Sequence, residues 1–273
     1  MRSLQATSVP VMLKASLLFS LLILVGPALR ADEPSPVFKL CSQNEPLLPH
    51  IGPATDHASN PGILVELITQ TAKASGFEAL ILRMPWKRCI HNLKTGEIDA
   101  LFAVVWQPER ESWGHFPKSE NGELHREQRL WSGVYSIFTH KDSNLTWNGK
   151  QVGNVKTGIA SPLGYVVHKQ IHDMGVANKT SLSVREGFRL LSLNRLDGYV
   201  IEEQAGRLEA RQHNIQHLIR KLPKPFLVAD WYMPLSHQFV KKYPQRSQLL
   251  WQKLSKIRET QTPTLLEKYM NKL

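Results

Sequence analysis

The residues able to do chemistry are scattered and do not form a catalytic set. Ser161 has no histidine beside it in a recognisable nucleophile turn, and the chain has no HExxH signature and no glycine-rich phosphate loop. Glu202 and Glu203 are neighbours in sequence, which does not make them a facing general acid and base. The histidines are scattered, and neither cysteine has a CxxC partner. We therefore predict a protein that is not an enzyme and holds no metal ion and no cofactor.

The two cysteines, Cys41 and Cys89, are suited to a covalent role. In an oxidising compartment such a pair tends to join. A bond between them would close a loop of about 48 residues and stabilise the fold by about 3–4 kcal/mol. The alternative is two buried free thiols, because the sequence does not supply the required geometry. We predict the disulfide.

The first 31 residues predict export to such a compartment. They contain Arg2 and Lys14, an apolar run over 15–29 and a small residue at Ala31, which together are typical of a secretory signal peptide. The run is shorter than the roughly 18–20 residues of a membrane span. We predict cleavage near Ala31 and a periplasmic protein.

The net charge of +11 falls to +8 without the leader, which holds three basic residues and no acid. The remaining lysines and arginines stand singly or in pairs between apolar positions, as on solvated helix faces. A nucleic-acid-binding surface would cluster them with aromatic residues. We therefore predict no nucleic-acid partner and only a mild preference for anionic solutes.

Hydrophobic periodicity predicts alternating strands and helices in both halves of the chain. A turn-rich stretch over 45–62 follows the first strand and could hold a binding loop. The continuous apolar run over 98–105 predicts a strand buried on both faces. Two closing helices have no sheet of their own and must pack back on an earlier unit, so the chain crosses between units twice. The expected strands are 37–40, 79–84, 98–105, 151–159, 180–184, 198–201 and 226–229, and the expected helices are 63–75, 86–94, 164–174, 185–193, 204–213, 247–259 and 263–271.

The turn at Ser161 and Pro162 predicts a helix N-terminus, with the serine as cap and the proline as first helical residue. Such an end presents free backbone N–H groups to an anion. Simple capping is the alternative reading.

Eight short motifs follow one another along the chain after the leader. They are Gly62-Ile-Leu-Val-Glu-Leu-Ile, Met84-Pro-Trp-Lys-Arg-Cys89, Leu93-Lys-Thr-Gly96-Glu-Ile-Asp99-Ala, Gln107-Pro-Glu-Arg110, Phe116-Pro117, Leu193-Asn-Arg195-Leu-Asp197-Gly, Trp251-Gln-Lys-Leu-Ser-Lys-Ile and Glu267-Lys-Tyr269. In this order they resemble the family 3 bacterial extracellular solute-binding proteins, receptors that feed polar amino acids to ABC importers. The resemblance covers nearly all of the chain after the leader.

The resemblance implies an α/β fold of the periplasmic-binding-protein-like type II. Such a fold has two lobes, each with a mixed β-sheet flanked by helices, joined by two hinge crossings. After the signal peptide at 1–31, we expect lobe 1 to comprise 32–136 and 234–273 and lobe 2 to comprise 137–233.

The resemblance also implies ligand-binding residues. Arg110 would grip a ligand carboxylate, for which the planar, permanently charged guanidinium is suited; the alternative is a surface arginine paired with Glu109 or Glu111. Glu202 would hold a ligand ammonium; the alternative is an acid favoured by a helix dipole. The turn from Ser161 to Gly164 would donate to the same carboxylate. Trp86 and Trp106 would form an apolar wall, or belong to the core.

The expected function follows from these residues. The protein would capture a small polar solute, an amino acid or a related carboxylate or amine, by lobe closure. It would act as a monomer and deliver the solute to the membrane permease of an ABC importer. The alternatives are a periplasmic sensor that uses the same cleft and a dehydratase-type enzyme on this fold. The first loop reads Glu45-Pro-Leu-Leu-Pro-His50-Ile where the amino-acid receptors usually place an aromatic residue, and the segment 116–129 is longer than in compact members.

Overall fold

The computed structural model describes residues 35–55 and 59–270. In the first part of the chain, β1 (Val37–Gln43), α1 (Ile63–Ala74), β2 (Glu78–Met84) and α2 (Trp86–Thr95) follow the predicted order. The predicted leader, residues 1–31, lies outside the described residues. Within the described ranges, no helix is both long enough and apolar enough to cross a membrane.

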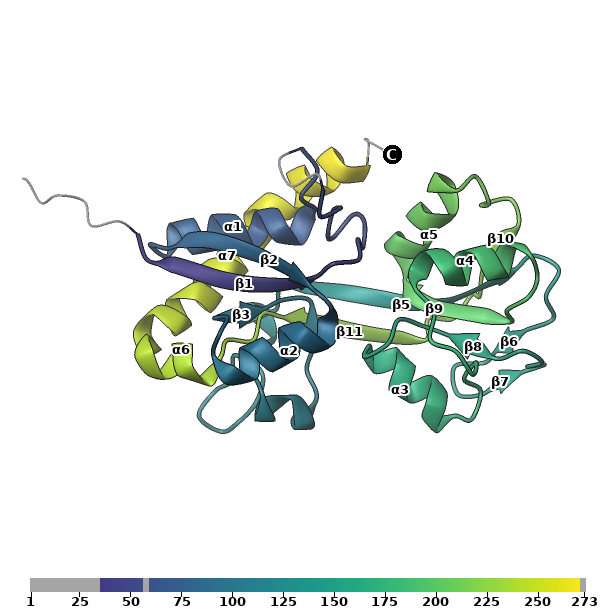
Figure 1. Cartoon of the computed structure of the whole chain (residues 1–273), viewed down its shortest axis with the longest axis horizontal. Helices are drawn as coiled ribbons and strands as arrows, with labels where there is room; N and C mark the ends of the chain where they lie inside the picture. Colours follow the sequence, from purple (N-terminus) through teal and green to yellow (C-terminus); the bar gives the residue numbers. More distant parts are fainter. Residues whose placement is uncertain (1–34, 56–58, 271–273) are drawn as a thin grey trace, which may run out of the picture. The chain divides into compact units, whose positions relative to one another are not determined.

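A parallel sheet is formed by β1, β2 and the short strand β3 (Ala100–Leu101), with β1 in the centre. Parallel neighbours need a crossover connection, which α1 supplies between β1 and β2, and α2 between β2 and β3. The two helices lie on opposite faces of the sheet (Figure 1). Gly96 ends α2 in the left-handed conformation, with φ 79°.

The predicted single strand over 98–105 is wrong. The chain forms β3, then turns at Ala103, whose φ is 61°, and continues as β4 (Val104–Val105). A left-handed alanine cannot continue a strand. As a result β3 pairs with β1, whereas β4 pairs with β11 (Leu227–Tyr232) in a second sheet.

The second sheet has the order β4-β11-β5-β9-β8, and β10 (Ile219–Lys221) also pairs with β5. Its central strands are β5 (Trp131–His140) and β9 (Gly198–Glu202), both largely buried, and β8 (Ile159–Ala160) lies at the edge. A separate hairpin comprises β6 (Thr146–Trp147) and β7 (Val152–Gly153). The predicted strand over 151–159 is therefore two short strands.

Three helices cover this second sheet: α3 (Val166–Asp173), α4 (Val184–Ser192) and α5 (Glu203–Gln212). The predicted strand over 180–184 is wrong, because Ser183 caps α4 by accepting a hydrogen bond from the backbone N–H of Glu186 at 3.2 Å.

The chain passes between its two lobes twice, along β5 and β11, which are antiparallel neighbours (Figure 1). Strand β5 continues through residue 136 without a break. The predicted boundaries at 136/137 and 233/234 remain predictions.

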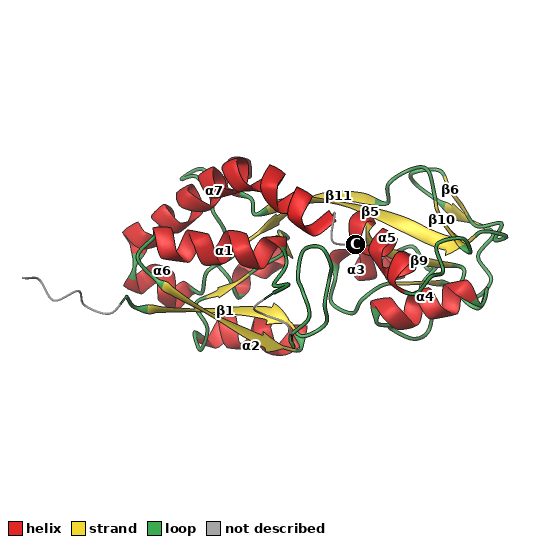
Figure 2. Cartoon of the chain, turned by 90° about the horizontal axis from the view of Figure 1, so that it is seen from above, coloured by secondary structure: helices red, strands yellow, loops and turns green. Residues whose placement is uncertain are grey.

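After β11 the chain returns to the first lobe and forms α6 (His237–Lys242) and α7 (Pro244–Met270). The prediction of two closing helices is wrong, because α7 continues through Pro263. The proline removes one backbone N–H, yet the helix continues to Met270. Helix α7 lies beside α1 (Figure 2), and Gly62 N–H donates to the hydroxyl of the buried Tyr269 at 3.1 Å.

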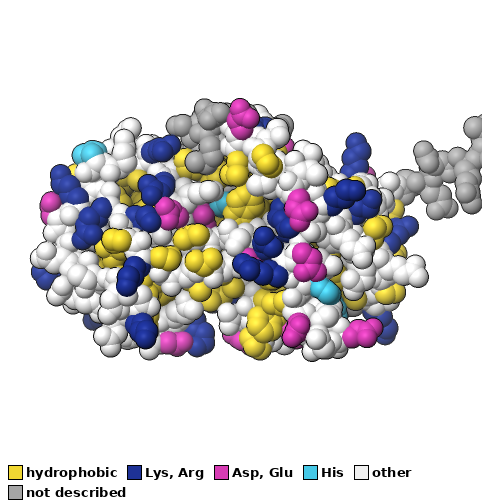
Figure 3. All heavy atoms as spheres, turned by 180° about the vertical axis from the view of Figure 1, so that it is seen from behind, with side chains coloured by type: hydrophobic (Ala, Val, Ile, Leu, Met, Phe, Trp, Pro, Cys, Tyr) yellow, Lys and Arg dark blue, Asp and Glu magenta, His cyan; other side chains and the backbone are white. Residues whose placement is uncertain are grey.

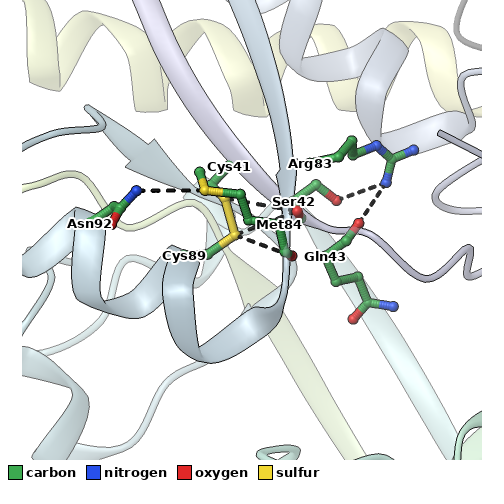
Figure 4. The surroundings of a disulfide bond; sticks show 7 residues. All are labelled: Cys41, Ser42, Gln43, Arg83, Met84, Cys89 and Asn92. Atoms are coloured by element: carbon green, nitrogen blue, oxygen red, sulfur yellow. Dashed lines mark hydrogen bonds between the residues drawn. A yellow bond between two sulfur atoms is a disulfide. The ribbon is translucent and has the colours of Figure 1, made fainter.

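The predicted disulfide between Cys41 and Cys89 is confirmed, with a Cα–Cα distance of 5.6 Å. Both cysteines are fully buried, in a small apolar cluster that includes Leu93 and Phe116. The bond joins β1 to α2, and Arg83 on β2 donates to the Ser42 hydroxyl and the Gln43 carbonyl beside it (Figure 4).

Lysine and arginine side chains are spread across the face drawn in Figure 3, with acidic side chains between them. Among the described residues, some basic side chains pair with acids, as Lys169 does with Asp173 and Arg189 with Glu186.

Candidate ligand-binding site

A pocket lies where the end of β1, the β3–β4 turn and the hinge strands meet the start of α3. Its volume is about 440 Å³ when the space open to solvent is counted. With the side chains as they stand, its enclosed part holds about one water molecule. It is lined by Gln43, Leu47, Ile51, Trp86, Phe102, Ala103, Val105, Arg110, Tyr135, Gly164, Tyr165, Val166 and Trp231.

Arg110 is the one charged side chain among these described lining residues. It belongs to a short 3₁₀ helix, η1 (Pro108–Ser112), which follows β4. Its Nη1 donates to the Val105 carbonyl at 3.0 Å and its Nη2 to the Gly164 carbonyl at 3.2 Å. Within the described residues it forms no salt bridge with a carboxylate, although the exposed Glu109 beside it in η1 acts electrostatically on the guanidinium. Burial lowers the pKa of Arg110, yet a guanidinium stays charged.

Trp86 and Gly164 meet on one wall of the pocket. Gly164 has φ 84°, and a Cβ there would lie 2.9 Å from Cδ1 of the Trp86 ring. Glycine is therefore required both by the backbone conformation and by the contact. The indole Nε1 of Trp86 is buried with no hydrogen-bond partner in the described part of the chain.

The predicted helix start at Ser161 is wrong. Helix α3 begins at Val166, after a turn that contains Gly164, and Tyr165 holds the cap position. Ser161 is fully buried, its Oγ lies 3.4 Å from Nδ1 of His168, and it does not line the pocket. The turn therefore presents a carbonyl oxygen to Arg110.

Glu202 caps helix α5, which is the alternative that the sequence left open. Its Oε2 accepts from the backbone N–H of Ala205 at 2.9 Å and lies 3.0 Å from Nε2 of His50. Both side chains are buried, and neither lines the pocket. The His50 ring is packed edge-on against Trp131 and Trp231.

Trp106 is engaged outside the pocket. Its indole N–H donates to Glu111 at 2.7 Å, and the Lys118 ammonium lies 5.4 Å from the ring centroid. Lys118 also pairs with Glu111. Of the two predicted wall tryptophans, only Trp86 lines the pocket.

Sequence reasoning missed the tyrosines and Gln43. The Tyr165 hydroxyl donates to Oε1 of Gln43 at 2.7 Å, which joins the end of β1 to the turn before α3. Burial raises the pKa of Tyr165 and of Tyr135, so both remain neutral phenols. A polar residue at the carboxyl end of a parallel strand, as Gln43 is, was a usable signal. The turn-rich stretch contributes Leu47 and Ile51 to the pocket.

The described residues contain no group of three or more histidine, cysteine or acidic side chains placed to hold a metal ion.

No protein-family model matches the chain, and no curated protein matches its sequence. Many solved structures do match. A mutant of ArgBP from T. maritima has a TM-score of 0.67 at 14% identity, covering 87% of this chain and 96% of that one. A histidine kinase sensor domain with similarity to periplasmic binding proteins has a TM-score of 0.65 at 14% identity, covering 85% and 95%.

A third similar structure is the ancestral amino acid-binding protein AncCDT-1, a precursor of cyclohexadienyl dehydratase. Its TM-score is 0.63 at 16% identity, and the match covers 85% of this chain and 95% of that one. At these identities the likeness defines the fold. The chain has the two-lobed, type II periplasmic-binding-protein fold.

Proposed function

We propose that this protein captures a small solute bearing a carboxylate, an amino acid or a related compound, in the pocket at Arg110. The observation that carries the proposal is a partly buried guanidinium whose described hydrogen-bond partners are neutral carbonyl oxygens and whose charged neighbour, Glu109, is exposed. A desolvated cation without an anionic partner is costly, and a carboxylate would both neutralise it and accept a bidentate pair of hydrogen bonds.

Binding requires the lobes to move. In the present arrangement, hydrogen bonds from Arg110 to Gly164 and from Tyr165 to Gln43 span the pocket. A solute would enter when these contacts open, and its contacts with both lobes would then favour closure by differential affinity. The strands β5 and β11 are the connections on which the lobes would turn.

The proposed setting is the periplasm, reached through the leader at 1–31, with the membrane permease of an ABC importer as partner. The fold supports this, since similar structures include ArgBP. A sensor partner is the second candidate, supported by the similarity to a kinase sensor domain. Co-purification of the ligand-loaded protein with a permease or with a kinase encoded by a neighbouring gene would distinguish the two partners.

The direct test is thermal stability of the purified protein with a panel of amino acids, small carboxylates and amines. A solute that binds the folded state raises the melting temperature by mass action. We expect a shift with one carboxylate class, lost in Arg110→Ala and retained in Arg211→Ala, a matched change at an exposed arginine. The proposal is overturned if Arg110→Ala keeps the shift or if only amines give one. Chemical turnover of the bound solute would overturn the prediction that the protein is not an enzyme.

A further inference from the structure

We infer that the solute is a carboxylate with an apolar body and without an ammonium group, so that free α-amino acids are poor ligands. This inference rests on the proposed function and concerns the same pocket.

The charge of the pocket favours an anionic solute. Arg110 brings one positive charge, and no aspartate or glutamate is among the described lining residues. A ligand carboxylate is therefore matched, whereas an ammonium beside it would be enclosed near Arg110 with no lining carboxylate of the protein to pair with. Enclosing an unpaired charge is strongly unfavourable.

Glu202 is the acid that the resemblance assigns to a ligand ammonium. Its Oε2 already accepts from Ala205 N–H and contacts Nε2 of His50. Its side chain is 4% exposed, and that of His50 is 0% exposed. The carboxylate is thus committed to the cap of α5 and to His50, outside the pocket.

Hydrogen-bond donors outnumber acceptors at the pocket. In the present arrangement the Val105 and Gly164 carbonyls accept from Arg110, and Gln43 Oε1 accepts from Tyr165. Opening the contacts at Gly164 and Gln43 frees one donor with each acceptor. Donors remain in surplus. A guanidinium has five N–H groups, and the buried Trp86 indole N–H has no partner within the described residues. A donor-rich pocket selects a solute that accepts hydrogen bonds.

The remaining wall of the pocket favours an apolar body on the solute. The lining is otherwise apolar or aromatic, from Leu47, Ile51, Phe102, Val166 and Trp231. Burying apolar ligand surface against such side chains contributes about 25 cal/mol per Å². A branched or aromatic body on the carboxylate therefore fits better than a second polar group.

Two acids lie near the pocket without lining it. Glu109 precedes Arg110 in η1, is exposed and acts electrostatically on its guanidinium. Glu45 lines an adjoining groove that shares Gln43, Trp86 and Tyr165 with the pocket, and it is exposed. An ammonium far from the carboxylate could reach it, whereas an α-ammonium is held close to the carboxylate at Arg110. The inference therefore concerns α-amino acids.

The test uses pairs of solutes that differ only in the α-amino group: 3-phenylpropanoate with phenylalanine, and 4-methylpentanoate with leucine. Dissociation constants are measured by calorimetry with the purified protein at pH 7.5. We expect the acid without the amino group to bind at least tenfold more tightly in one pair or both. Equal or tighter binding of the amino acid in an Arg110-dependent manner overturns this inference and leaves the proposed function standing. If no carboxylate binds at all, both are overturned.

A substitution in the pocket wall tests whether the missing acid is the cause of this preference. Val166→Asp adds an acid to the pocket wall, and Val166→Asn adds a neutral group of the same size. We expect the preference against the amino acid to fall at least fivefold in the aspartate variant and to remain in the asparagine variant. An unchanged preference in a folded Val166→Asp protein that still binds contradicts the charge argument. Should this variant not fold, the wild-type pairs decide the inference.

Discussion

Gly164 is the residue at which backbone conformation and the proposed ligand recognition coincide. Its carbonyl accepts from Arg110, its φ is 84°, and the Trp86 ring packs where a side chain would be. Gly175, also with positive φ at 70°, has open space around its Cα. The two glycines thus separate the cost of the conformation from the cost of the contact.

We predict that Gly175→Ala lowers the free energy of unfolding by about 1–2 kcal/mol, the cost of a left-handed alanine, and leaves ligand affinity unchanged. Gly164→Ala should lose more stability and also weaken binding, because its Cβ displaces Trp86. Denaturant unfolding and calorimetry on both variants measure the difference. Equal effects of the two changes on affinity would contradict this account of the pocket wall.

The site could be predicted in part, and the reason lies in the range of the contacts. Arg110 and Gly164 stand in short motifs that can be recognised from their neighbours in the sequence. The pairing of His50 with Glu202 joins residues 152 positions apart, which no local pattern reveals. Tyr135 and Trp231 line the pocket from buried strands, where their spacing resembles that of core residues.

At the scale of elements, the disulfide joins two parts of the pocket. Cys41 lies two residues before Gln43 at the end of β1, and Cys89 lies in the first turn of α2, which begins at Trp86. The bond thus fixes the strand and the helix that carry a hydrogen-bonding group and a wall of the site (Figure 4).

We predict that the double variant Cys41→Ala, Cys89→Ala loses about 3–4 kcal/mol of stability, since the unfolded chain regains the freedom of a loop of 48 residues. Denaturant unfolding of both proteins, followed by a spectroscopic signal from the first lobe, would measure this loss. The loss should exceed that of a single-site control such as Ser183→Ala, which removes only a helix cap worth about 1 kcal/mol. A loss no greater than that of the control would argue against the disulfide as a major stabilising element.

The order of helices and strands could be predicted well, and the errors have physical causes. Periodicity reports which residues are buried, so it finds α1, β2 and α2. It does not report the left-handed turn at Ala103, which splits an apolar run between two sheets. Nor does it reveal that α7, which packs against α1, continues through Pro263.

At the scale of the whole molecule, two histidines couple stability to pH. Burial, and then the neighbouring His237, lower the pKa of His115; burial, and then His172, lower the pKa of His168. Glu111 opposes and Lys118 reinforces the shift at His115. As the pH falls below about 6.5, the unfolded chain binds protons at these positions before the folded protein does.

We therefore predict that the stability contributed by these neutral histidines is complete above about pH 6.5 and is lost as the pH falls through their lowered pKa values. Melting temperatures measured between pH 5 and pH 8 should decline on the acid side. The decline should be shallower in His168→Gln and unaltered in His217→Gln, a change at an exposed histidine. The same slope in all three proteins would contradict the assignment to His168.

The complete burial of Cys41 and Cys89 has a kinetic consequence. Thiol–disulfide exchange needs a thiolate to reach a sulfur atom in line with the bond, so a reductant can act only after the strand and helix around these cysteines have come apart. The rate of reduction of the native protein at saturating reductant then equals the rate of that opening. The rate of disulfide reduction therefore reports the rate of local unfolding around the two cysteines. A solute that stabilises the pocket would lower this rate.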